Sequence, residues 1–131
     1  MSERGTVVPV LALVMVGGAL AVALSVEVGK CSASWREASF AADAGAEAGA
    51  AMLDPDEAYA GRLRLAPPAA EEAAVAAALA ARPRVGRRAE AAATDRRVCV
   101  TIRQPFPPGL LTPFVSGRQI VAVACASPRR G

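Results

Sequence analysis

The chain contains no histidine and few aromatic residues, and both absences narrow what it can do. Without histidine, neither a nucleophile–histidine–acid arrangement nor a mixed cysteine–histidine metal site can form. Aromatic residues make up 4% of the chain and hydrophobic residues 53%, so the apolar content comes mainly from alanine, valine and leucine. That composition suits helix packing better than a large interior with a deep pocket. Nucleotide-binding loops of the G-x-x-x-x-G-K-[ST] and G-x-G-x-x-G forms are also missing. We therefore expect no enzyme, no cofactor, no metal and no small-molecule substrate.

Charge is nearly balanced, with a formal net value of +3, and Lys30 is the only lysine. This preference for arginine is typical of a GC-rich bacterial genome. The arginines between residues 82 and 97 are interrupted by Glu90 and Asp95, and no aromatic residue interleaves with them. Nucleic acid is therefore an unlikely partner, and we interpret the segment as a solvated linker face, with lipid headgroup contact as the alternative. The carboxylates at positions 54, 56, 57, 71 and 72 are interpreted as solvated caps of helices and turns.

An uncharged run from Gly5 to Val26 is the strongest signal in the sequence. Its 22 residues would form a helix of about 33 Å at about 1.5 Å per residue, enough to cross a hydrocarbon core of about 30 Å. Pro9 falls in the first turns, where its missing N–H is least damaging. The run predicts a transmembrane helix over residues 5–26 that follows a cytoplasmic stub of residues 1–4.

A cleaved secretory signal peptide is the competing interpretation of this run. An Ala-x-Ala site is present at residues 21–23, but it lies inside the apolar run, and the basic region before the run is only Arg4 and the terminal amine, opposed by Glu3. Charges on the two sides of the run nearly cancel and do not decide the orientation. Because the cysteine pattern favours an oxidising location for the rest of the chain, we expect a single-pass protein of the bacterial cytoplasmic membrane with its N-terminus inside.

Residues 27–53 predict a helical stem that continues the first helix out of the bilayer, because residues 34–53 are rich in alanine and contain no proline. Asp54-Pro55-Asp56 ends it. Gly45 and Gly49 lie four residues apart, and with Gly17 and Ala21 they are candidates for a face where another helix packs closely. An alanine-rich genome would produce the same spacing without any contact.

The remaining residues, 54–131, predict a small extracytoplasmic domain of the α+β class. Two prolines at 67 and 68, followed by alanine-rich sequence to Arg82, predict a second helix whose thin apolar stripe is chiefly Val75 and Leu79. Alternating residues at 98–103 and 120–124 predict two strands of an antiparallel hairpin or sheet. The proline-rich segment 104–117 connects them, and its apolar residues are expected to cap the core: Phe106, Leu110, Leu111, Phe114 and Val115.

The three cysteines lack the short paired spacing of a zinc site. Pairing the two strands with Arg103 opposite Val121 places Cys99 opposite Cys125, so we expect a disulfide between them, although cross-strand neighbours approach disulfide geometry only at some ladder positions. Cys31, beside the membrane segment, is then the unpaired cysteine.

The opening Glu3-Arg4-Gly5-Thr6-Val7, which runs straight into the apolar helix, and the alanine- and glycine-rich stretch 41–50 resemble the TadE/TadG-like pilus assembly proteins. The valine-alternating tail fits as well. The resemblance implies a non-enzymatic, pilin-like component of the tight-adherence (Tad/Flp-type) type IV pilus or secretion system, with other pilus proteins as partners. It also implies a prepilin-type cleavage between Gly5 and Thr6. The pattern departs at Val10, where the family signal carries a glutamate.

Two other functions compete with this one. The first is a small anchored or secreted protein with a disulfide-closed hairpin that binds an envelope ligand. The second is a single-pass membrane regulator that acts through helix pairing. Neighbouring genes for a secretion ATPase and polytopic assembly proteins would separate the pilus function from both.

Overall fold

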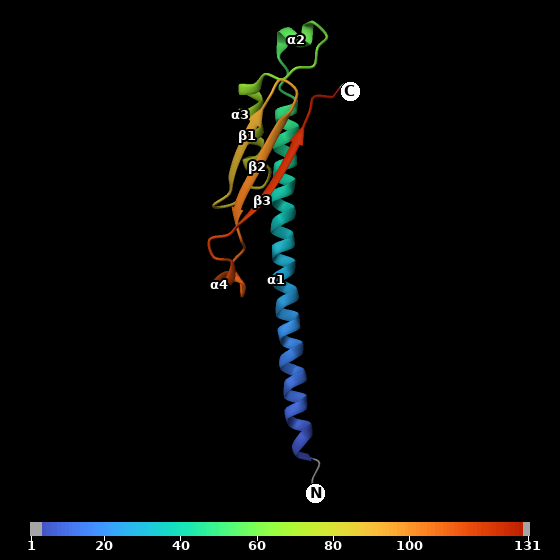
Figure 1. Ribbon diagram of the computed structural model, residues 1–131, viewed down its shortest axis with the longest axis vertical. Coiled ribbons are helices and arrows are strands. Elements are labelled where there is room, and N and C mark those ends of the chain that lie inside the picture. Colours follow the sequence, from blue (N-terminus) through green and yellow to red (C-terminus); the bar gives the residue numbers. More distant parts are fainter. Residues whose placement is uncertain (1–3, 130–131) are drawn as a thin grey trace.

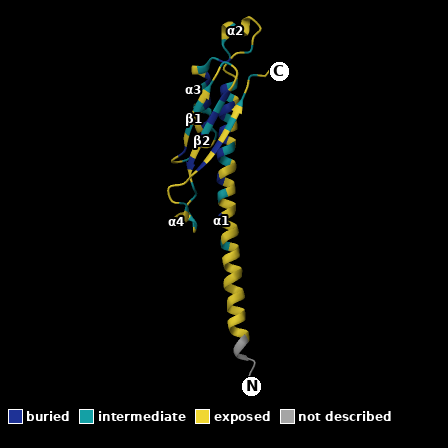
Figure 2. Cartoon of the chain, viewed as in Figure 1, coloured by how far each residue is buried: buried dark blue, intermediate teal, exposed yellow. Residues whose placement is uncertain are grey.

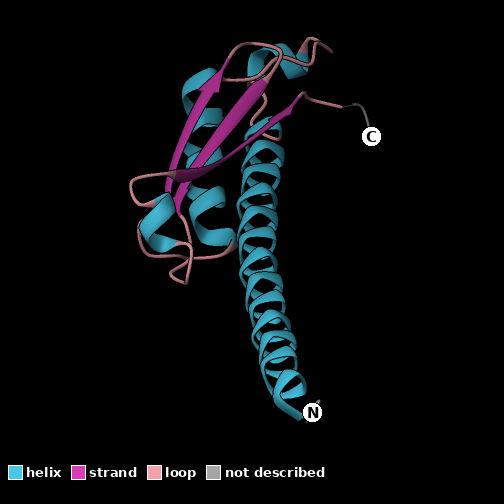
Figure 3. Cartoon of the chain, turned by 60° about the horizontal axis from the view of Figure 1, so that its bottom comes forward, coloured by secondary structure: helices cyan, strands magenta, loops and turns pink. Residues whose placement is uncertain are grey.

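The computed structural model describes residues 4–129, with side-chain surroundings from residue 7 onward, and it has the expected α+β class. A three-stranded antiparallel sheet of order β1-β2-β3 packs one face against helices (Figures 1 and 3). The chain forms, in order, α1 (Arg4–Ala50), α2 (Pro55–Tyr59), α3 (Pro67–Ala81), β1 (Arg88–Ala93), β2 (Val98–Pro105), α4 (Thr112–Val115) and β3 (Gln119–Ala126).

Helix α1 is a single helix of 47 residues, and its two halves have different surroundings. Its N-terminal half extends well beyond the rest of the molecule and is exposed almost throughout, whereas its C-terminal half lies along the sheet (Figure 2). Pro9 is accommodated in the first turns, as expected. The C-terminal half supplies Ala38, Ala41, Ala42 and Ala46 to the core. The compact unit therefore includes the segment predicted as a separate stem over residues 27–53, and it does not begin at residue 54.

The core is built largely from small residues, because α1 and α3 approach each other closely. On α3 the buried face consists of Ala70, Ala74 and Ala78. The predicted stripe of Val75 and Leu79 is wrong, since Leu79 is 40% exposed and Val75 only half-buried. Larger side chains enter the core from the sheet and from the segment before α3, and these are Leu65, Val98, Val100, Ile102 and Ile120.

Strands β2 and β3 pair in the predicted register, with Arg103 opposite Val121 and Cys99 opposite Cys125. Cys99 and Cys125 are joined by a disulfide with a Cα–Cα distance of 4.0 Å, on the sheet face that points away from the helices. Cys31 is a free, half-buried cysteine. The alternation of β2 buries Val98, Val100, Ile102 and Gln104 against the helices.

Strand β1 contradicts the interpretation of residues 82–97 as a solvated linker. Arg88–Ala93 forms an edge strand that pairs with β2 along six residues, Arg88 opposite Arg103 to Ala93 opposite Val98. Its sequence, RAEAAA, has no β-branched residue, so the pairing with β2 and not local propensity sets its conformation. Arg87, just before the strand, is buried and not solvated.

The connection between β2 and β3, residues 106–118, is not the cap on the core that the sequence predicts. We call it the β2–β3 loop. Phe106 packs against the core, but Leu110 and Phe114 are 62% and 79% exposed. The loop contains the single-turn helix α4 and lies at the end of the domain nearest the protruding half of α1 (Figure 1).

Candidate functional site

The protruding half of α1 is the most distinctive surface of the molecule. The structure contains, within the part that it describes, one helix long and apolar enough to cross a membrane, with a window of mean hydropathy 2.6 of which 0% is buried. A signal sequence near an N-terminus satisfies the same criteria of length and composition. Gly5 and Thr6 lie in the first turns of α1, outside the residues whose side chains are described.

Glu27 is the first charged residue after the apolar run, and it marks the place where the domain meets α1. Its side chain is 7% exposed and accepts a hydrogen bond of 2.9 Å from Lys30 Nζ. That bond lowers the pKa of the Glu27 carboxyl against the opposing effect of burial, and backbone hydrogen bonds from Leu110 and Leu111 act in the same direction as Lys30. Residue 27 is therefore bound to a loop more than eighty residues away in sequence.

The Glu27 carboxylate occupies the space beside Gly109. A Cβ built on Gly109 would overlap the carboxylate oxygens and lie 2.6 Å from Glu27 Cδ. The turn that follows is closed by two hydrogen bonds, from Gly109 N to Thr112 Oγ1 at 2.7 Å and from Thr112 N to Gly109 O at 3.1 Å. We call this contact between Glu27 and residues 109–111 the junction. Sequence reasoning missed it, although Glu27 is conspicuous as the first charge after the apolar run.

A second polar cluster fixes the segment before β1 to α1. Gln104 is fully buried, and its Oε1 accepts from Arg87 Nε at 2.8 Å while its Nε2 donates to Ser34 O at 2.7 Å. Arg84 donates to Glu37 Oε2 at 2.8 Å and to Ser34 Oγ at 3.2 Å. Burial lowers the pKa of the Arg87 guanidinium, and the Glu37 carboxylate at 3.9 Å opposes that effect. The cluster is structural, because it joins α1, β2 and the segment before β1, and its central residues, Arg87 and Gln104, are buried.

The small-residue face has its partner inside the molecule. A Cβ on Gly45 would lie 2.7 Å from Ala74 O and 2.8 Å from Ala78 Cβ, and one on Gly49 would lie 2.8 Å from Ala70 O. Both glycines thus allow α3 to approach α1. Gly17 has nothing within 4 Å, and Ala21 is exposed. At about 100° per residue, a position 28 residues earlier is rotated by roughly 80° around the helix, so the four residues do not form one face.

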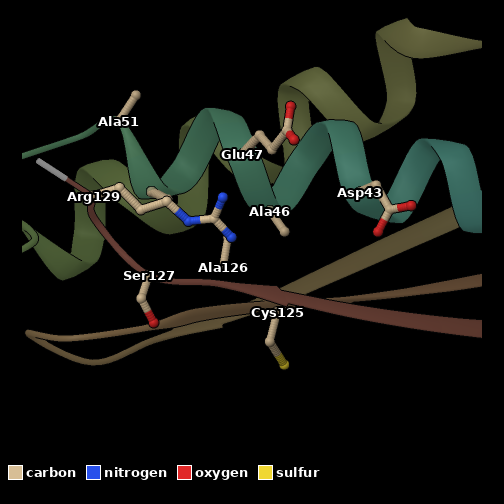
Figure 4. Close-up of a pocket in the computed structure, with 9 residues that line it drawn as sticks. Asp43, Ala46, Glu47, Ala51, Cys125, Ala126, Ser127 and Arg129 are labelled. Carbon is tan, nitrogen blue, oxygen red and sulfur yellow. The ribbon is translucent and has the colours of Figure 1, made fainter. Parts of the chain in front are cut away.

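An open groove of about 560 Å³ lies between the C-terminal half of α1 and the end of β3 (Figure 4). Asp43 and Glu47 line it from α1, Arg129 reaches over it from the C-terminal segment, and the Cys125 side chain points away from α1. It offers charges of both signs but no buried nucleophile. Among the residues with described side chains, no group of three or more histidine, cysteine, aspartate or glutamate residues could hold a metal ion. The groove is suited to surface contact.

Asp54 acts as a helix cap, as the sequence predicts. Its Oδ1 accepts from the backbone N–H groups of Asp56 at 3.0 Å and Glu57 at 3.3 Å at the start of α2. Glu71 accepts from the backbone N–H of Ala93 at 2.8 Å and so fastens α3 to β1.

Comparison of the chain with protein-family models, with curated proteins and with solved structures finds no match.

Proposed function

We propose that this chain is a non-enzymatic, single-pass membrane protein whose apolar half of α1 spans the cytoplasmic membrane of a bacterium, with the N-terminus inside and the domain outside. The observation that carries the proposal is the continuity of α1. One helix begins in an exposed apolar segment and ends as the central helix of a packed domain. Because no flexible linker intervenes, the membrane segment and the domain form one rigid body that fixes the height and direction of the domain.

The domain leaves one side of α1 open for lateral contact. Arg36, Phe40, Asp43 and Glu47 follow the i, i+4, i+7, i+11 spacing of one helix face, and all four are exposed. We call them the exposed stripe of α1. Phe40 is 54% exposed and lies under Arg82, whose Cζ is 5.6 Å from its ring centre. An apolar ring flanked by charges of both signs suits contact with a neighbouring helix.

We propose further that the stripe packs laterally in a type IV pilus or secretion assembly of the Tad/Flp type, with other pilus or secretion-system proteins as partners. The resemblance of residues 3–7 and 41–50 to TadE/TadG-like proteins supports this assignment. In such an assembly the apolar segments would pack side by side in the membrane, and the rigid α1 would carry that arrangement out to the domains. Whether the chain is cut between Gly5 and Thr6 decides between a filament subunit and an anchored accessory.

A second candidate function is a membrane-anchored protein that binds an envelope ligand through the outer face of its sheet. The observation that favours it is the exposure of Val121 and Val123, 44% and 62%, beside the disulfide on that face. This surface would suit a flat apolar partner.

Membrane topology is tested with single cysteines in a Cys31→Ser background. Tyr59→Cys places a thiol on α2, where the native side chain is 94% exposed, and Ser2→Cys places one before the apolar run. In right-side-out membrane vesicles, a membrane-impermeant maleimide should label position 59 and not position 2. In inverted vesicles the labelling should exchange. Labelling of both positions in both preparations would show that the chain does not span the membrane.

Lateral packing is tested with a photo-crosslinking residue at Phe40 and, as the matched control, at Val123 on the opposite side of the domain. In the native host, position 40 should form adducts with other membrane-anchored subunits and position 123 should not. Adducts from position 123 alone would support the envelope-ligand function and reject the lateral contact.

A further inference from the structure

The junction fixes the height of the β2–β3 loop relative to the apolar run. Glu27 directly follows Val26, the last residue of that run, and it holds residues 109–111 through its carboxylate. If α1 spans the bilayer as proposed above, Glu27 lies at the boundary between hydrocarbon and headgroups, because a run of about 33 Å fills a hydrocarbon core of about 30 Å. The loop bound to Glu27 lies at the same height.

The loop presents apolar side chains to its surroundings at that height. Leu110 is 62% exposed and Phe114 79% exposed, beside prolines at 108 and 113 that are exposed as well. Their backbone is fixed, since Phe114 N–H donates to Leu111 O at 2.9 Å and the Gly109–Thr112 turn is closed at both ends. Leucine and phenylalanine side chains that a rigid turn holds in water do not stabilise the fold. Their exposure therefore indicates that they contact an apolar partner.

Arginines surround the same end of the sheet without carboxylate partners. Arg88 lies directly opposite Arg103 on the exposed sheet face, and Arg118 ends the loop. Like charges directly opposite each other destabilise a sheet, and none of these three arginines forms an ion pair with any residue that the structure describes. Residues 96–131 contain no acidic residue, and Glu90 is the one carboxylate among the outward positions of the three strands. This arrangement fits a surface that bears negative charge.

From these observations we propose that the β2–β3 loop is a second membrane contact, which inserts Leu110 and Phe114 into the outer interface of the bilayer that α1 crosses while Arg88, Arg103 and Arg118 bind lipid phosphates. The occupant is the lipid surface itself, since the height set by Glu27, the exposed apolar pair and the positive charge all fit it. The contact would hold α1 at a fixed rotation and tilt, so that the exposed stripe meets its neighbours in one orientation. This inference rests on the proposed membrane-spanning role of α1.

Single tryptophan probes in a Trp35→Phe background test the contact with the full chain. Phe114→Trp places the probe on the loop, Tyr59→Trp places it on α2 at the other end of the domain, and Val16→Trp places it inside the apolar run. Each variant is reconstituted into vesicles of phosphatidylcholine and phosphatidylglycerol with brominated acyl chains. Emission from positions 16 and 114 should be quenched, and emission from position 59 should be unchanged.

The charge requirement is tested by replacing Arg103 and Arg118 with glutamine in the Phe114→Trp variant. Each arginine near an anionic surface contributes roughly a fivefold factor to binding, so quenching at position 114 should fall in phosphatidylglycerol vesicles. A Glu27→Ala change, which releases the loop from α1, should lower it too. The conservative Leu110→Met variant serves as a control that keeps the apolar surface and should keep the quenching.

The outcomes separate the two proposals. If position 16 is not quenched, the membrane-spanning role fails and the loop proposal fails with it. If position 16 is quenched while position 114 emits like position 59, the chain spans the membrane but the loop does not touch lipid, and the loop proposal is overturned. A blue shift at position 114 that appears only when a partner protein is added would assign the loop to a protein interface, which also overturns it.

Discussion

Substitution of Gly45 by alanine should destabilise the domain, although alanine is the better helix former. A Cβ at this position would lie 2.7 Å from the backbone oxygen of Ala74 and 2.8 Å from Ala78 Cβ. Neither atom can move without displacing α3, because one belongs to the backbone and the other is a rigid methyl group. Overpacking of this kind costs about 1–3 kcal/mol. The helix propensity of alanine returns up to about 1 kcal/mol.

Because both overlaps involve atoms that cannot move on their own, we place the overpacking cost in the upper part of that range, at about 2–3 kcal/mol. Subtracting about 1 kcal/mol for helix propensity leaves an expected net loss of about 1–2 kcal/mol, which corresponds to a fall in melting temperature of roughly 4–16 °C for a unit of about 100 residues. The assay is differential scanning calorimetry of the full chain in detergent micelles with the disulfide intact. Gly29→Ala is the matched control, since Gly29 lies in the same helix with nothing within 4 Å. Its melting temperature should stay the same or rise.

Comparing Gly45→Ala with Gly29→Ala isolates the packing of α1 on α3. Both variants add one methyl group to the same helix, but only the methyl group at position 45 meets α3. Gly49→Ala should resemble Gly45→Ala, since its Cβ would lie 2.8 Å from Ala70 O. If Gly45→Ala melts at or above the wild-type temperature, α3 does not lie where we place it, and the account of the core is refuted.

Three further predictions concern the disulfide, the buried glutamine and the junction. Replacing Cys99 and Cys125 with alanine opens a loop with a sequence separation of 26 and should cost about 3–4 kcal/mol in the chain-entropy treatment, measured by urea unfolding, whereas Cys31→Ala should change little. Gln104→Leu leaves Arg87 Nε and Ser34 O buried without their partner and should cost about 1–3 kcal/mol, against almost nothing for the exposed Gln119→Leu; equal effects would contradict the buried cluster. The pKa of Glu27 is lowered in the folded state, so its ionised carboxylate stabilises the fold fully at pH values above the ordinary glutamate pKa of 4.5. That stabilisation is lost as the pH falls below 4.5 and through the pKa of the folded state. We therefore expect the amide protons of Leu110 and Leu111 to lose protection from hydrogen exchange as the pH is lowered from about 7 through that range. Glu27→Gln should abolish this pH-dependent loss of protection, whereas Glu57→Gln should retain it.

The sequence predicts those elements whose pattern and chemistry agree. The alternation at 98–102, together with the positions of Cys99 and Cys125, leads to the observed register of β2 and β3. The absence of charge from residue 5 to 26 predicts the exposed half of α1. Pro67 and Pro68 mark the start of α3, because proline fits the first helical turn.

Other elements are determined by contacts that no local pattern reveals. The composition of residues 82–97 indicates a solvated linker, and residues 88–93 become a strand only because β2 offers an unpaired edge. On α3 the larger Val75 and Leu79 are excluded from the core, since the close approach to Gly45 and Gly49 leaves space for methyl groups alone. The contact of Glu27 with Gly109 joins positions whose spacing in the sequence carries no periodicity, so it becomes visible only in three dimensions.

The most direct test of the central claim, that the apolar half of α1 remains in the mature protein as its membrane anchor, is the intact mass of the chain recovered from membranes of the native host. The account predicts a mass that includes the apolar run, either for residues 1–131 or, after prepilin-type processing, for residues 6–131. Without reduction, alkylation should add one label to the chain, at the free thiol; after reduction it should add three, because the disulfide then supplies two more thiols. A mass that begins at residue 24, from protein found in the soluble fraction, would show that the run is a signal peptide removed after Ala23, and it would contradict the anchored protein proposed here.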